Sequence, residues 1–190
     1  MAKTARFFAT FSVIAGAGLV LVPLTTYAEN DSLTDKLVLE IDEMCSMTSS
    51  NEDAVYQTEI PNGQDATVGS TTFSVVCNHA GGWVVTATGG ENGTQMIDIE
   101  NDQLTIDTAG VSGLSGAKSG WGFLVKNANN AQIASGYENY SAVPSTENAS
   151  IVSGPTTASS SFETEYKIYI SPKQAAGTYV GSVVYTLAEP

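Results

Sequence analysis

The sequence predicts an all-β protein, an antiparallel β-sandwich of the Ig-like or Greek-key type with very little helix. Short runs in which apolar and polar residues alternate recur along the chain. Gly, Ser, Thr and Asn separate these runs, and helix signals are nearly absent. No internal repeat or linker divides the pattern, so we expect a single β-sandwich domain over residues 29–190.

The expected strands follow one another at short intervals. A first run alternates from Lys36 to Asp42, and a second, "DAVYQTEI", precedes the turn signal "PNG". "STTFSVVC" and "GWVVTATGG" flank "NHAG", which predicts a hairpin loop. Weaker runs stand at "QMIDIE" and "QLTID", and the most regular are "GWGFLVKN", "FETEYKIYI" and "TYVGSVVYTL". Residues 127–161 are the least regular and predict surface loops around one or two short strands, a common place for binding sites.

Residues 1–28 have the pattern of a secretory signal peptide. A positively charged start is followed by an apolar stretch to about Leu24, and small residues precede a cleavage site between Ala28 and Glu29. The alternative is an uncleaved membrane anchor, but two glycines and a proline interrupt the apolar stretch. We expect cleavage, export to the cell surface or medium, and no transmembrane span in the mature chain.

Cleavage would leave a strongly acidic chain. The whole sequence holds seven basic and 20 acidic residues, and without residues 1–28 five lysines remain, which gives a net charge of −15. No arginine is left for bidentate phosphate contacts, and the field of the chain repels polyanions. We therefore expect no nucleic-acid partner.

Cys45 and Cys77 are the only cysteines, and both follow the expected cleavage site. An even pair in an exported chain predicts a disulfide, and closing this loop stabilises the fold by about 3.7 kcal/mol in the chain-entropy model. The alternative, a zinc site, lacks ligands because His79 is the only histidine and no CxxC motif is present. We expect no cofactor.

Groups for catalysis are sparse, and we expect that the protein is not an enzyme. His79 is the single candidate for the base of a Ser-His-Asp triad, and no GxSxG motif is present. Calcium remains an alternative because Asp98, Glu100 and Asp102 alternate as early EF-hand ligands do. Gln103 stands where that loop requires glycine, however, and alternating acids more often form the solvated face of a strand.

Tyr137, Asn139 and Tyr140 are the candidate ligand-binding residues. They lie in the irregular polar segment, where an exposed ring beside an amide can stack on a sugar or contact a protein. The alternative is partial burial of this loop against the sheet. Trp83 and Trp121 stand in expected strands and are predicted to be core residues.

Two separated segments resemble one family. "GAKSGWGFLV", with Trp121 and Phe123, looks like the Trp-x-Leu motif of WxL cell-surface domains, and "GTYVGSVVYTLAEP", with Tyr185 and Leu187, resembles their terminal strand. Phe123 stands where the family has Leu, and Tyr185 where its second motif has Trp. The chain also looks similar to small exported sandwich proteins of candidate-phyla bacteria. The resemblance implies a surface role with non-covalent attachment to the bacterial cell wall.

The expectation that follows is an exported, non-enzymatic surface protein that mediates binding or adhesion. Its partner would be cell-wall polysaccharide, peptidoglycan or another surface protein. The alternatives are a pilin-like subunit that exchanges a terminal strand with its neighbour, and a carbohydrate-binding module. "TYVGSVVYTL" is expected as one continuous last strand whose larger side chains face inward, and Tyr179 is expected to make a tyrosine-corner-like hydrogen bond at its entry.

Overall fold

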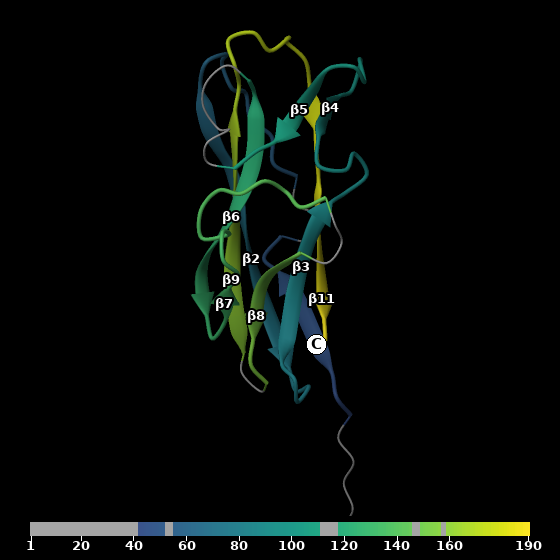
Figure 1. Ribbon diagram of the computed structural model, residues 1–190, viewed down its shortest axis with the longest axis vertical. Coiled ribbons are helices and arrows are strands. Elements are labelled where there is room, and N and C mark those ends of the chain that lie inside the picture. The colour runs from purple at the N-terminus through teal and green to yellow at the C-terminus, as the bar shows by residue number, and fades with distance from the viewer. Residues whose placement is uncertain (1–41, 52–54, 111–117, 146–148, 157–158) are drawn as a thin grey trace, which may run out of the picture. The chain divides into compact units, whose positions relative to one another are not determined.

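The computed structural model describes residues 42–51, 55–110, 118–145, 149–156 and 159–190, and these residues form strands and connecting loops without a helix (Figure 1). The prediction of an all-β fold is confirmed. The expected signal peptide and residues 36–41 of the first expected strand lie outside the described residues. The strands are β1 (Cys45–Ser49), β2 (Asp65–Cys77), β3 (Trp83–Gly89), β4 (Met96–Asp98), β5 (Thr105–Thr108), β6 (Gly120–Asn129), β7 (Gln132–Ile133), β8 (Ser150–Gly154), β9 (Ser160–Tyr169), β10 (Tyr179–Val180) and β11 (Val183–Ala188).

The strands form two sheets that enclose one core. The seven-stranded sheet has the order β1-β2-β9-β6-β5-β4-β10, and the four-stranded sheet has the order β11-β3-β8-β7. In Figure 1, β2, β9 and β6 run together as one layer, and β11, β3 and β8 form the other. Alternate side chains of each strand point between the layers. The buried ones include Phe73, Phe123, Phe162, Trp83, Val85, Ile151 and Val152.

The segment "NHAG" connects the two sheets and is not a hairpin loop, so that prediction was wrong. β2 pairs with β1 on one side and β9 on the other, so neither of its edges is free for β3. The chain turns through Gly82, which has a φ of 80° and whose N–H donates to the carbonyl of His79 at 2.9 Å. β3 then pairs with β8 and β11 in the other sheet.

The segment from Val55 to Ile60 was expected as a strand, but it forms no ladder. Tyr56 lies flat against β2 at Gly69, where an added Cβ would stand 2.2 Å from its ring. The Tyr56 hydroxyl donates to the carbonyl of Ser70 at 2.5 Å. The segment therefore covers β2 with a side chain instead of pairing with its backbone. The turn predicted at "PNG" is present, since the N–H of Gln64 donates to the carbonyl of Pro61 at 3.2 Å.

One strand pair departs from the expected antiparallel arrangement. β5 runs parallel to β6, with Asp107 opposite Gly120 and Thr108 opposite Trp121. Beyond β5, the same edge of β6 pairs with the segment after β7. Phe123 and Ser141 exchange backbone hydrogen bonds of 3.0 and 2.8 Å there. The irregular segment after β7 thus runs along β6, and this contact places its aromatic residues.

The last strand is divided between the two sheets. β10 pairs with β4 in the seven-stranded sheet, and β11 pairs with β3 in the four-stranded sheet. The crossing falls at Gly181 and Ser182, and a Cβ at Gly181 would meet the Met96 side chain at 2.8 Å. Prediction of one continuous strand was therefore wrong. The predicted inward positions are confirmed, because Tyr179, Val183, Tyr185 and Leu187 pack against the core.

The predicted disulfide is confirmed between Cys45 on β1 and Cys77 on β2. The two residues are directly opposite in the ladder, with their Cα atoms 4.0 Å apart. The bridge stands at the beginning of β1 and fixes this five-residue edge strand to the 13-residue β2.

Candidate functional site

The residues that resemble the WxL motifs are interior residues. Trp121 is 4% exposed and its indole N–H donates to the carbonyl of Thr94 at 3.1 Å, and Phe123 is fully buried. The Phe123 ring lies 6.3 Å from that of Tyr185, and Leu187 packs against the same core. The two motif segments therefore meet in the core of the sandwich, where Trp121 and Phe123 are buried and Tyr185 and Leu187 are partly buried.

The tyrosine-corner-like bond expected at the entry of the last strand is present. The Tyr179 hydroxyl donates to the carbonyl of Ala175 at 2.9 Å and accepts a hydrogen bond from the amide of Gln174 at 2.8 Å. Both partners lie upstream in the loop after β9. Tyr179 therefore fixes this loop just before the chain crosses between the sheets.

The three candidate ligand-binding residues have different environments. The Tyr137 ring packs on Phe123 with centroids 5.5 Å apart, and burial raises the pKa of its hydroxyl. Tyr137 thus anchors the loop to the core, as the alternative reading of the sequence expected. Asn139 is exposed, and Tyr140 is half-buried on the outer side of the seven-stranded sheet. Only the latter two remain as surface candidates.

Tyr140 is held on the sheet by charged groups of β9. Its hydroxyl donates to Oε1 of Glu165, and the ammonium of Lys167 lies 5.6 Å from the centre of its ring. Burial, followed by the bond to Glu165, raises the pKa of the Tyr140 hydroxyl. The ring is therefore fixed by two contacts and needs no reordering before it meets a ligand.

Around Tyr140, charged side chains of opposite sign form ion pairs between neighbouring strands. Lys126 of β6 forms ion pairs with Glu165 and, at 3.4 Å, with Glu163. The bonds from Lys126 and then from Tyr140 lower the pKa of Glu165, and the bond with Glu165 raises that of Lys126. Lys167 pairs in the same way with Asp65 of β2, which raises the Lys167 pKa. We call this set the charged face: Asp65, Lys126, Tyr140, Glu163, Glu165 and Lys167.

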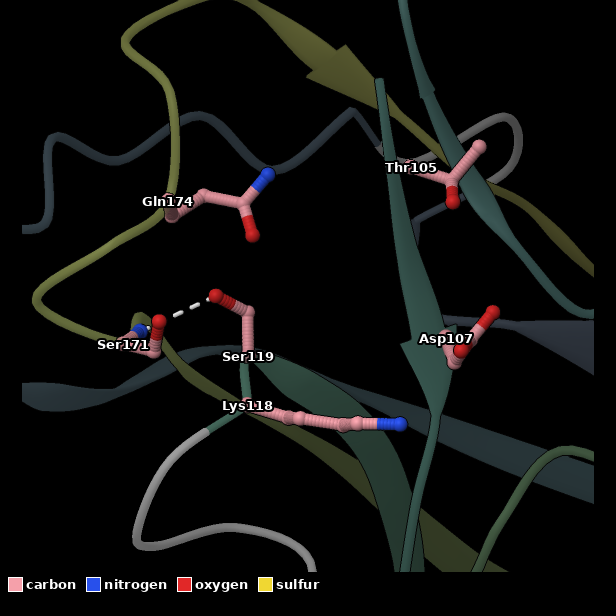
Figure 2. A pocket seen from close by; sticks show the side chains of 6 residues that line it. All are labelled: Thr105, Asp107, Lys118, Ser119, Ser171 and Gln174. Atoms are coloured by element: carbon pink, nitrogen blue, oxygen red, sulfur yellow. Dashed lines mark hydrogen bonds between the residues drawn. The ribbon is translucent and has the colours of Figure 1, made fainter. Parts of the chain in front are cut away.

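A polar cavity of about 250 Å³ lies near the start of β6 (Figure 2). The N–H of Ser171 donates to the hydroxyl of Ser119 at 2.9 Å, and the Lys118 side chain extends toward Asp107 in the figure. The Asp107 carboxylate accepts a bond of 2.7 Å from the Gln95 amide. The cavity offers hydroxyls, an amide and one charge of each sign; its lining is Thr105, Asp107, Lys118, Ser119, Ser171 and Gln174.

The outer side of the four-stranded sheet has no charged side chain at the outward positions of its described strands. Val184, at 47% exposed, lies opposite Thr88, and Thr186 lies opposite Thr86. We call this surface the uncharged face; by pairing and alternation it comprises Val84, Thr86, Thr88, Gln132, Ser150, Ser153, Val184, Thr186 and Ala188.

The acidic residues considered for calcium do not form the alternating face of a strand. β4 ends at Asp98, whose Oδ1 accepts the backbone N–H groups of Glu100 at 3.1 Å and Asn101 at 2.9 Å. Asp98 therefore stabilises a turn, and Glu100 and Asp102 follow in the loop. Among the described residues no three His, Cys, Asp or Glu side chains converge to hold a metal ion.

Two features of the surface were missed in the sequence. "FETEYKI" places Glu163, Glu165 and Lys167 at alternate positions, which is a visible signal for a charged strand face. The pairing of Glu165 with Lys126, 39 positions earlier in the chain, has no local signal because it depends on β6 and β9 being neighbours.

Comparison with known families and with curated proteins gives no match, either to a family model or to a single protein. The described part of the chain also holds no helix long and apolar enough to cross a membrane.

Proposed function

We propose that this chain is an exported, non-enzymatic bacterial surface protein that binds cell-wall polysaccharide or peptidoglycan non-covalently through the charged face. The observation that supports the proposal is the fixed ring of Tyr140, with Glu165 bonded to its hydroxyl and Lys167 beside the ring. A rigid tyrosine ring with polar neighbours provides stacking area and directional hydrogen bonds to a sugar at little entropic cost.

The surroundings of Tyr140 suit a ligand rich in hydroxyl groups. Exposed Asn139 adds an amide beside the ring, and the charged face supplies both carboxylate acceptors and ammonium donors. The net charge of −15 expected for the mature chain opposes a polyanionic polymer. We therefore propose a glycan whose contacts are made by hydroxyl and amide groups.

A pelleting experiment with purified peptidoglycan tests this proposal. The wild-type chain is expected to co-sediment at low and at high salt, and Tyr140→Ala is expected to reduce binding about tenfold, the loss of one aromatic contact. Tyr140→Phe is the matched control, because it retains the ring and removes only the hydroxyl, which hydrogen-bonds with Glu165 and Thr67. We expect Tyr140→Phe to retain most of the binding.

Two results would reject the proposal: a wild-type chain that stays in the supernatant under every salt condition, or a Tyr140→Ala chain that pellets as well as wild type. Circular dichroism of each variant confirms that the fold is intact before pelleting. A glycan array then identifies the sugar.

A pilin-like exchange of the last strand is less favoured by the packing. Tyr185 and Leu187 of β11 lie in the chain's own core, and the Tyr185 hydroxyl is 2.7 Å from that of Tyr166 on β9. Donating β11 to a neighbour would withdraw these side chains from the interior, at the cost of their burial.

A further inference from the structure

Among the described strands, β11 is an edge of the four-stranded sheet and pairs only with β3. The N–H of Gly90 donates to the carbonyl of Ser182 at 3.0 Å, which fixes the alternation of the ladder. Along an antiparallel strand, the backbone N–H and C=O groups of successive residues point alternately to the neighbour on one side and to the opposite side. The backbone groups of Val183, Tyr185 and Leu187 therefore point to the open edge.

The six residues of β11 lack the features that usually prevent an edge strand from pairing with another chain; Glu189 and Pro190 follow the strand. Edge strands are normally protected by charged side chains, proline or a bulge. β11 reads "VVYTLA", without charge or proline over its six residues. Its ladder with β3 runs in continuous register from Val183 to Ala188, so no bulge interrupts it.

The neighbouring edge on the same side has the same character. β1 contacts β11 across the open side of the sandwich but belongs to the other sheet. It reads "CSMTS" and also carries no charge. Each outer surface beside these edges also has an exposed valine: Val184 on the four-stranded sheet is 47% exposed, and Val76 on the seven-stranded sheet, opposite Ser46, is 57% exposed. The two edge strands thus form an uncharged side of a strongly acidic chain.

We propose that two copies of this chain associate through this side, with β11 of one copy pairing antiparallel to β11 of the other across a two-fold axis. The strand is self-complementary, since an axis at Tyr185 places Val183 of each copy opposite Leu187 of its partner. All three residues direct their backbone groups to the edge, so each N–H meets a carbonyl. The pairing joins two four-stranded sheets into one.

The charge distribution favours a second copy over a foreign partner. Two chains of net charge −15 repel each other at most approaches, and an uncharged side is where that repulsion is smallest. A cationic partner would instead be drawn to the acidic surfaces. Because screening weakens repulsion between exposed charges, the association should strengthen as salt is added.

Light scattering after gel filtration of the full exported chain tests the proposal. Its apparent mass should rise toward twice the monomer value as protein concentration and salt increase. Thr186→Lys puts an outward-pointing charge on the edge strand and should weaken the association at least about tenfold. The matched control is Thr72→Lys, at an exposed threonine on β2 opposite Glu163 in the seven-stranded sheet, which should leave the association unchanged.

Hydrogen exchange of the wild-type chain supplies a readout without a substitution. The amides of Val183, Tyr185 and Leu187 should become more protected from exchange at high protein concentration. The amides of β10, an edge strand of the seven-stranded sheet, should exchange as before. A monomer at all concentrations and salts would overturn the proposal, and so would a dimer unaffected by Thr186→Lys or protected only at another surface. Peptidoglycan binding by Thr186→Lys should equal that of wild type, so this test and that of the proposed function fail independently.

Discussion

The outer face of the seven-stranded sheet carries Lys126 between Glu163 and Glu165, whereas the outer face of the four-stranded sheet carries threonine, serine and valine. The same rule, alternation along a strand, builds both faces over one shared core. The difference lies in the alternate positions that do not contribute to the core. We propose that the charged face binds a glycan and that the β11 edge, which borders the uncharged face, binds a second copy of the chain.

The largest expected effect comes from the disulfide that fixes β1 to β2. Replacing both Cys45 and Cys77 with serine should lower the free energy of unfolding by about 2–4 kcal/mol, because the bridge closes the loop between the two strands. Urea unfolding of the double variant measures the loss. Wild type treated with reductant should unfold at the same urea concentration; a double variant as stable as oxidised wild type would contradict the prediction.

A smaller effect is expected where the chain passes from one sheet to the other. Tyr179→Phe removes the bond to the Ala175 carbonyl and should lower the free energy of unfolding by about 1 kcal/mol. Thermal unfolding measures the change. A Tyr179→Phe chain as stable as wild type would show that this hydrogen bond does not stabilise the fold.

The smallest expected effect is a pH-dependent loss of stability, which should occur on the charged face and not on the uncharged face. The pKa of Glu165 is lowered by Lys126 and Tyr140, so the carboxylate stabilises the fold above its ordinary pKa of about 4.3, and this contribution is lost as pH falls through the lowered value. Glu165→Gln should therefore cost about 0.5 kcal/mol at neutral pH and nothing in strong acid. Urea unfolding at both pH values measures it.

The uncharged face provides the control for this comparison. Thr86→Val replaces an outward side chain that has no charge, so its effect on stability should be the same at both pH values. If the effect of Glu165→Gln on the free energy of unfolding were also the same at both pH values, the ion pair with Lys126 would contribute nothing measurable to stability.

Much of the fold could be predicted because its signals are local. The alternation in "GWGFLVKN" places Trp121, Phe123 and Val125 inward, and all three are buried. Cysteine pairing was also predictable, since only one pair exists. Errors arose where a segment had a choice of neighbours: "NHAG" joins two sheets because β2 already has two partners, and Val55–Ile60 covers β2 through Tyr56.

The candidate site was predicted only in part. The sequence singled out Tyr137 and Tyr140 as equivalent, and the structure separates them, because one ring packs on Phe123 and the other lies with Glu165 and Lys167. Their positions three residues apart give no indication of this. The difference follows from the hydrogen bonds of Tyr137 and Ser141 to β6, which turn one side chain toward the core and the other over the sheet.

The sequence by itself determined most of the strands, the inward set of side chains and the disulfide, because each depends on the order and chemistry of near neighbours. Tertiary structure decided which strands meet. It divided the last run at Gly181, assigned β10 and β11 to different sheets, and left β11 as an uncharged edge. These results depend on packing between segments far apart in the chain, because the whole fold sets the space beside Met96 and the edge of β3 with which β11 pairs.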